Sequence, residues 1–450
     1  MSEIVNSATS RDPLERPISR QDRPQTRFTL DRRWRIFLLL LVIGSVSYID
    51  RVSISVGMPL IADEFGLNPQ QQGYVLSAFF WTYAVFQIPG GWAADRYGPR
   101  RVIGSVMLLW AVIQTVTGLA ANTIQLVVMR VFLGAAEAAQ LPSGAKLSAL
   151  WLANRERARG AALMNSSASL GSAFGGLLVG GLISWLGDWR EAFIVVGAGG
   201  LAFALVAYWY LRDSPQEHPG VTARECDFIE AELEAEAIAD ADVLPEHPTS
   251  PINYLRQRTF WAMGLGWLSA NLVFYGLLTF GPLYLYQERG LDIKTMAGAV
   301  FVMFGAGFVG ENFAGWIAQR WRERGGTANV VMRTIFSISA LGSTAAVVGV
   351  AYVPSAGAAV ALLAVTLFFL RFMGLYWSLP ATLAARRHVG IVGGMMNLFA
   401  NIGGIAIPLI TGAIVSATGS YFPALMMFAG AGIAYMLFSL SIDYSKKLPV

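Results

Sequence analysis

The sequence has few of the residues that build metal centres and disulfides. Its 450 residues include one cysteine, Cys226, and three histidines, His218, His247 and His388. A single cysteine excludes an intramolecular disulfide and any metal site that needs several thiolates. The histidines all fall in predicted loops, so we expect no histidine metal centre within the apolar segments.

Charge is equally scarce. Charged residues make up 14% of the chain and hydrophobic residues 55%, whereas roughly 25% of a typical soluble protein is charged. The mean hydropathy is +0.51. This composition indicates an integral membrane protein, and the net charge of +4 then reflects basic cytoplasmic loops rather than nucleic-acid binding. We expect the lipid bilayer as a partner, and no nucleic acid.

Long apolar runs recur along almost the whole chain. Each has about 20 residues or more, which is enough for a membrane-spanning helix. The pattern predicts an all-α integral membrane protein with twelve transmembrane helices in two six-helix halves. The predicted spans are 34–57, 71–93, 101–121, 123–147, 157–185, 190–211, 259–285, 295–319, 330–352, 357–384, 389–417 and 421–442.

Basic residues predict the orientation. One set of connections holds arginine clusters at 96–101, 155–159, 320–324 and 386–387, and the tails add further basic residues on that side. The opposite set holds only Arg190, Arg289 and Lys294. Because Lys and Arg are enriched in cytoplasmic loops, we expect both termini in the cytoplasm and the spans in the cell (inner) membrane.

The predicted organisation has five parts. These are a disordered cytoplasmic tail (1–31), a six-helix bundle (32–212), a cytoplasmic linker (213–256), a second six-helix bundle (257–443) and a short tail (444–450). The linker contains EAELEAEAIADAD, which we interpret as a solvated acidic helix. GGWAADRYGPRR at 90–101 and AGWIAQRWRERG at 314–325 occupy corresponding places in the halves, an internal duplication common in secondary transporters.

Two predicted spans contain charged side chains. Asp50 and Arg51 are neighbours in the first span, and Arg130, Gly134 and Glu137 share one helical face in the fourth. A charge inside the bilayer costs at least a few kcal/mol and has to face the bundle interior or a wet cavity. Adjacent side chains point about 100° apart, so one of Asp50 and Arg51 should face the cavity and the other a neighbouring helix.

Two interpretations of these charges compete. Either they form salt bridges that only hold the first and fourth spans together, or they form a proton-coupled anion site. In the second case an arginine is the fixed cation, since it does not lose its proton, and Asp50 and Glu137 carry protons. An arriving anion can switch the protonation of such a carboxylate. We favour the second interpretation because ionisable residues within membranes are usually functional.

These motifs resemble the major facilitator superfamily, and within it the anion:cation symporter family. GGWAADRYGPRR is similar to the superfamily's loop motif after the second helix. YIDR at 48–51 and R-x-x-x-G-x-x-E at 130–137 are similar to the sugar-acid branch of the symporters. The resemblance extends over essentially all of residues 34–442.

The resemblance implies roles for the matching residues. Arg51 resembles the ligand of the substrate carboxylate, and Tyr48 and Tyr83 resemble its polar aromatic neighbours. Asp50 and Glu137 resemble the protonation sites, and Arg130 resembles the arginine that tunes Glu137.

Further matches lie in the second half and in the loop motif. YWSLP and MMNLFANIGG place Trp377, Ser378 and Asn397 where the family contacts the rest of the substrate. The loop motif resembles a cytoplasmic latch, in which the carboxylate caps a helix N-terminus in one state and releases it in the other. The residues of this latch are Gly91, Asp95, Arg96, Gly98 and Arg101.

The sequence departs from the sugar-acid pattern at two places. Ala168 stands at or near a glutamine of that branch, which weakens the case for a polyhydroxylated substrate unless Asn165 or Ser169 substitutes for it. Arg371 adds a second arginine near the middle of the tenth span. It either binds a second carboxylate or an aromatic acid, or it pairs with Glu311, and the second alternative is slightly favoured because Glu311 needs a partner.

The sequence thus predicts a proton-coupled symporter that imports a small organic carboxylate by alternating access. A sugar acid, a dicarboxylate and an aromatic acid remain open as substrates. We expect a monomer with no catalytic residue, no metal and no cofactor, the proton being the coupling ion. An exporter or antiporter of amphiphilic compounds on the same fold is the main alternative. A membrane enzyme would need a convergent nucleophile, metal or cofactor site, and a sensor would need a domain longer than the linker.

Overall fold

The computed structural model describes residues 31–241, 251–384, 388–446 and 448, and its regular segments are helices. The predicted tail at 1–30 and part of the linker lie outside the described residues. The helices of the first half and the linker are α1 (Arg32–Phe65), α2 (Pro69–Tyr97), α3 (Pro99–Thr117), α4 (Thr123–Glu137), α5 (Gln140–Trp151), α6 (Asn154–Leu186), α7 (Trp189–Tyr210) and α8 (Ala223–Ala241). Those of the second half are η2 (Pro251–Arg256), α9 (Arg258–Gln287), α10 (Ile293–Glu323), α11 (Ala328–Tyr352), α12 (Ala356–Leu370), η3 (Arg371–Ser378), α13 (Leu379–Leu383), α14 (Val389–Thr418) and α15 (Phe422–Leu440).

Every predicted span coincides with a helix or with consecutive helices. Among the described residues, ten helical segments are long and apolar enough to cross a membrane, and α2 and α3 are not among those ten. The chain is therefore a multi-pass membrane protein. Two spans are interrupted: the fourth consists of α4 and α5, and the tenth consists of α12, the 3-10 helix η3 and α13.

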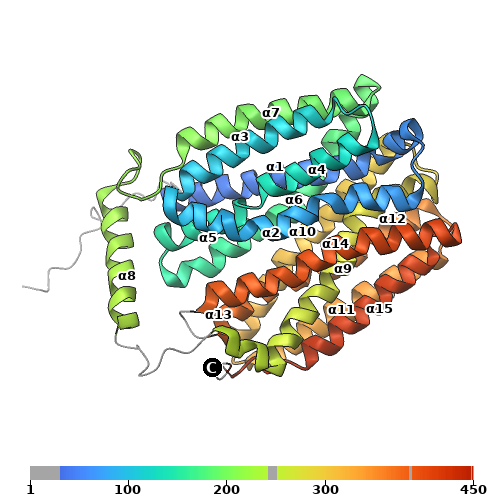
Figure 1. Cartoon of the computed structure of the whole chain (residues 1–450). Coiled ribbons are helices and arrows are strands. Elements are labelled where there is room, and N and C mark those ends of the chain that lie inside the picture. Colours follow the sequence, from blue (N-terminus) through green and yellow to red (C-terminus); the bar gives the residue numbers. More distant parts are fainter. Residues whose placement is uncertain (1–30, 242–250, 385–387, 447, 449–450) are drawn as a thin grey trace, which may run out of the picture.

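The helices gather into two groups. Figure 1 shows α1–α7, in blue to green, on one side and α9–α15, in yellow to red, on the other. Within the first group α1 packs on α6 and α3 packs on α7; within the second, α9 packs on α14 and α15. The groups meet mainly where α1 packs on α9, α2 on α14 and α6 on α10, and η3 also packs on α6.

The two groups touch closely at one end of the bundle, where small residues let the helices approach. A Cβ at Gly412 of α14 would lie 2.5 Å from the carbonyl oxygen of Pro69. A Cβ at Gly180 of α6 would fall on Ala297 of α10. Such close backbone approach is typical of helix contacts in membranes.

The groups separate towards the other end. Gly394 precedes Gly412 by five helical turns and faces the same way, yet a Cβ at Gly394 would meet nothing within 4 Å. Ala162 stands in the same relation to Gly180 on α6 and is exposed. Gly394 and Ala162 are thus packed less tightly than Gly412 and Gly180, and they lie towards the end of the bundle at which α8 lies (Figure 1).

The linker docks on the first half instead of being fully solvated. Glu225 of α8 is buried and accepts hydrogen bonds from the backbone N–H groups of Arg32 and Arg33 at 3.2 and 3.0 Å. A carboxylate at this place satisfies the free N–H groups at the start of α1 and suits the positive end of its dipole. Nearby, burial and the charges of Arg32 and Arg212 lower the pKa of His218.

Candidate functional site

An ion pair between α1 and α4 lies at the centre of the first half. Arg51 Nε donates to Glu137 Oε2 at 3.0 Å, and Ser47 Oγ donates to the same oxygen at 2.5 Å. The side chain of Arg51 is 4% exposed and that of Glu137 is 0% exposed. Pairing is what permits both charges at this depth, because an unpaired buried charge is strongly unfavourable.

Three aromatic rings surround the Arg51 guanidinium. Its central carbon lies 4.6 Å from the ring centroid of Tyr48, 4.6 Å from that of Phe79 and 4.4 Å from that of Tyr83. These cation–π contacts hold the guanidinium in place. Nε is the one nitrogen of this guanidinium that donates a hydrogen bond within the described part of the chain. The other two nitrogens keep their donors for an anion.

The remaining charges of α1 and α4 lie beside this pair. Asp50 and Arg130 are 2% and 3% exposed, and Arg130 lies within electrostatic range of both Asp50 and Glu137. Its guanidinium carbon is 5.1 Å from the centroid of Phe79, the ring that also contacts Arg51. Asp50 likewise lies within electrostatic range of Glu137, Arg130 and Arg51.

Gly134 allows α4, the helix that carries Glu137, to pack closely against α2. A Cβ at Gly134 would overlap the carbonyl oxygen of Phe79 on α2, so only glycine permits this approach. Thr82 fastens the same contact by donating from Oγ1 to the carbonyl oxygen of Val131 at 2.5 Å.

A second buried ion pair lies in the other half. Arg371, the first residue of η3, donates from Nη2 to Glu311 Oε2 at 2.5 Å. Asn165 of α6 donates from Nδ2 to the other oxygen of Glu311, and its carbonyl oxygen lies 3.4 Å from Arg371 Nη2. Of the two alternatives for Arg371, the structure shows the pair with Glu311. The pair also contacts the first half through Asn165, which is thereby occupied.

The other residues predicted to contact the substrate have mixed surroundings. Asn397 of α14 donates from Nδ2 to Gln87 Oε1 of α2 at 3.1 Å, which joins the two halves. Trp377 packs edge-on against Trp267 at 5.9 Å, and its indole Nε1 is buried without a hydrogen-bond partner among the described residues. Ser378 donates to its own helix, at the carbonyl oxygen of Leu375. Their role in binding stays a prediction.

The residues of the predicted latch lie at the surface, and their role as a latch stays a prediction. Asp95 is 67% exposed and pairs with Lys146 of α5 at 2.8 Å, and Arg96 and Arg101 are exposed. Gly98 is the N-cap residue of α3 and has a positive φ of 87°. A carboxylate does meet the N-terminus of α3, but it is that of Asp213, which accepts from the backbone N–H of Arg100 at 2.7 Å. Gly91 packs lightly against Pro142.

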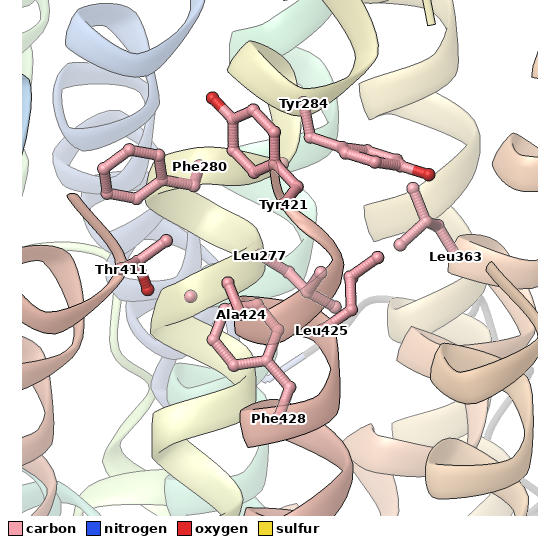
Figure 2. A pocket seen from close by; sticks show the side chains of 11 residues that line it. Leu277, Phe280, Tyr284, Leu363, Thr411, Tyr421, Ala424, Leu425 and Phe428 are labelled. Carbon is pink, nitrogen blue, oxygen red and sulfur yellow. The ribbon is translucent and has the colours of Figure 1, made fainter. Parts of the chain in front are cut away.

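An apolar cavity in the second half is unsuited to an anion. It holds about 10 Å³ between α9, α12, α14 and α15, and Figure 2 shows the aromatic and aliphatic side chains that line it. That volume is about the size of one water molecule. In the described residues no group of three or more His, Cys, Asp and Glu side chains could hold a metal ion.

Sequence reasoning missed several residues of the site. Ser47 and Phe79 complete the surroundings of Arg51, yet serine and phenylalanine are ordinary in a membrane helix. Helical spacing offers a signal for Ser47, because it precedes Arg51 by one turn and shares its face. No comparable signal exists for Gln87, whose partner Asn397 comes from the other half.

Known proteins are similar to this chain over most of its length. Residues 40–408 match the Major Facilitator Superfamily. A probable sulfoacetate transporter of Cupriavidus necator is 34% identical over 86% of this chain and 89% of its own. The hexuronate transporter of Bacillus subtilis is 29% identical over 88% and 92% of the two chains. A probable galactarate/D-glucarate transporter of Escherichia coli is also 29% identical, over 88% and 91%.

A solved structure supports the same assignment of the fold. A bacterial homologue of the human lysosomal transporter Spinster, in an inward-facing and unoccupied conformation, superimposes with a TM-score of 0.69. It is 20% identical in sequence, and the match covers 94% of this chain and all of the other. The predicted resemblance is confirmed: the chain belongs to the Major Facilitator Superfamily, with relatives among its sugar-acid and sulfoacetate transporters.

Proposed function

We propose that this protein is a proton-coupled symporter that imports a small organic carboxylate across the bacterial inner membrane. The observation that carries the proposal is the buried pair of Arg51 and Glu137 inside an aromatic enclosure. In this arrangement, the carboxylate of an incoming substrate and that of Glu137 compete for the guanidinium of Arg51.

Proton coupling follows from this competition. A substrate carboxylate that docks on Arg51 leaves Glu137 without its cation, in a place where an unpaired charge is strongly unfavourable. Glu137 is then stabilised by taking up a proton, since arginine cannot give one up. Glu137 Oε1 is buried and accepts no hydrogen bond from the described residues, so one of its oxygens is free to carry that proton.

Asp50 and Arg130 form a second acid–base couple next to the first. A proton on Asp50 frees the positive charge of Arg130 to act on Glu137, and its loss reverses the effect. We assign Asp50 and Glu137 as the protonation sites, with Arg130 setting the balance between them. Tyr48 and Tyr83 position Arg51 through their rings.

Alternating access supplies the direction of transport. We take the protein as a monomer with twelve spans, with both termini and the linker in the cytoplasm, as the arginine-rich loops indicate. The end sealed by Gly412 and Gly180 is then the outer one, and the site opens inwards. Protons and substrate enter from outside, the halves rock about the central site, and release to the less acidic cytoplasm resets the carboxylates.

The relatives support this reading of the substrate class. The substrates in their names, sulfoacetate, hexuronate and galactarate or D-glucarate, are small organic anions. The alternative, an exporter of amphiphilic compounds, would need a broad apolar cavity and no fixed cation, whereas Arg51 is held by four side chains, Glu137 and three aromatic rings.

Uptake by purified protein in liposomes, with an inward proton gradient, tests the proposal. Arg51→Ala should abolish binding and uptake of every organic anion that the wild type accepts. Arg190→Ala is the matched control, because it removes an arginine paired with a glutamate, Glu64, at the outer end of the bundle. If Arg51→Ala still transports organic anions, or if wild type and Arg51→Ala export amphiphilic compounds equally well, the proposal is wrong.

A further inference from the structure

Each half of the bundle contains one buried carboxylate–guanidinium pair. Arg51 and Glu137 form the pair of the first half, and Arg371 and Glu311 form that of the second. Each guanidinium also lies on an aromatic ring; for Arg371 this is Phe274, with 5.0 Å between the guanidinium carbon and the ring centroid. The second pair therefore repeats the chemistry of the first.

The two pairs lie on either side of the contact between the halves. Tyr48 of α1 and Tyr275 of α9 each lie within electrostatic range of both Arg51 and Arg371. The α1 and α9 helices pack on each other, and η3 packs on both α6 and α9. A ligand between the halves thus meets one guanidinium from each half.

Arg371 has an unused hydrogen-bond donor. It is 2% exposed, and its Nε has no hydrogen-bond partner among the described residues. The hydroxyl of Ser169, fully buried on α6, is likewise without a partner there. Both adjoin Gly307, where a Cβ would lie 3.0 Å from Arg371 Cγ and 3.5 Å from Ser169 Oγ. Two buried donors thus meet at a position where α10 has no side chain.

We propose that the substrate is a small dianion whose two acid groups bind Arg51 and Arg371, and that Glu311 is a further proton acceptor in the cycle. This inference rests on the proposed function, and it names the substrate class and a third carboxylate in the coupling. The second acid group, a carboxylate or a sulfonate, accepts from Arg371 Nε and Nη and from Ser169 Oγ.

The charges balance with one proton for each acid group. In the empty site both arginines are neutralised by Glu137 and Glu311. When the dianion replaces both glutamates, each glutamate takes up a proton from the outer side, and the site keeps the same net charge. On the inner side the dianion leaves, both glutamates lose their protons, and both ion pairs form again.

The surroundings of Glu311 contain few other groups that could take this proton. Arg371 faces it from η3 and Asn165 from α6, and Tyr275 of α9 and Tyr48 of α1 lie within range of Arg371. The α12 helix has no titratable side chain. In α11 the titratable residues are Arg333, which donates to the carbonyl oxygen of Ile442, and the exposed Tyr352.

Binding of matched anions to the purified full chain tests the inference. Galactarate and galactonate differ only in one terminal carboxylate, and sulfoacetate and acetate differ in the sulfonate. We expect the wild type to prefer the dianion of each pair. Glu311→Gln/Arg371→Gln, which removes both charges together and leaves no buried charge unpaired, should lower dianion affinity about 10- to 100-fold. It should change the affinity for any monoanion that binds by less than about threefold.

The single variant Glu311→Gln tests whether Glu311 takes up one of the protons that accompany dianion binding. It should still bind the dianion, but the slope of log Kd against pH should fall by about one proton per dianion. An unchanged slope, or a double variant that still prefers dianions as the wild type does, would overturn the inference and leave the pair as a bridge from α10 to α6. Two other results would refute the proposed function itself. In the first, Arg51→Ala still binds these anions; in the second, the wild type binds none of them.

Discussion

Replacing Glu137 by glutamine isolates the proton-coupling step. The change removes one charge and keeps the shape, so the amide oxygen can still accept from Ser47 and Arg51 at the places that Glu137 Oε2 occupies. What changes is the competitor that a substrate carboxylate has to displace. A hydrogen bond to a charged group contributes roughly 1.5–3 kcal/mol, and one between neutral groups about 1 kcal/mol.

The magnitudes follow from these figures. The competitor is weakened by about 0.5–2 kcal/mol, so Glu137→Gln should bind the substrate anion roughly 2- to 30-fold more tightly where wild-type Glu137 is ionised. Under the proposed coupling, binding to the wild type requires a proton on Glu137, so affinity should fall as pH rises, by about tenfold per pH unit and per proton. That part of the pH dependence should vanish in Glu137→Gln, while counterflow exchange continues and accumulation driven by a pH gradient is lost.

Isothermal titration at pH 6, 7 and 8 measures the first effect, and uptake into liposomes with and without a pH gradient measures the second. Glu64→Gln is a suitable control because Glu64 also pairs with an arginine, Arg190, but is 42% exposed at the outer end. The reasoning is refuted if Glu137→Gln keeps the wild-type pH slope or accumulates substrate normally.

Two further predictions concern the conformational cycle and the linker. With Cys226 replaced by serine, a disulfide between Gly180→Cys and Ala297→Cys should lock the closed end and stop transport until it is reduced, because these positions touch across the two halves; uptake that continues after complete cross-linking would contradict alternating access. Burial and the neighbouring arginines lower the pKa of His218, so the unfolded chain binds more protons below about pH 6.5 and stability should fall as pH drops from 7 to 5. His218→Asn, which keeps an acceptor for the backbone N–H of Gly220, should lose less thermal stability over that range, and an equal loss would contradict the assignment.

Much of this fold could be read from the sequence, because apolar length is a local property. Every predicted span coincides with helical residues, and the acid–base pairs of α1 and α4 were identifiable from their spacing. The break at η3 was not predicted, since the stretch around Arg371 reads as one continuous apolar segment. In membrane helices the backbone can leave the α-helical path where neighbouring helices satisfy it.

Contacts between distant segments were the least predictable part. Three contacts join residues that no sequence motif links. They are Glu225 with the start of α1, Asp213 with the start of α3, and Gln87 with Asn397. These polar side chains have ordinary neighbours in the sequence, and only the packing of the helices decides which of them meet. The pairing of Glu311 with Arg371 was one of two alternatives for the same reason.

The eight residues of η3 make the tenth span longer than an α-helix of the same residues would be. A 3-10 helix rises about 2.0 Å per residue and an α-helix about 1.5 Å, so rewinding η3 would shorten this span by about 4 Å. It would also turn Arg371 relative to Ser378 by about 140° in total, since they are seven residues apart and the twist per residue differs by about 20°. In this span, a change in helix type at η3 would therefore couple two movements. The guanidinium of Arg371 would rotate about the helix axis, and the helical residues beyond η3 would shift along that axis.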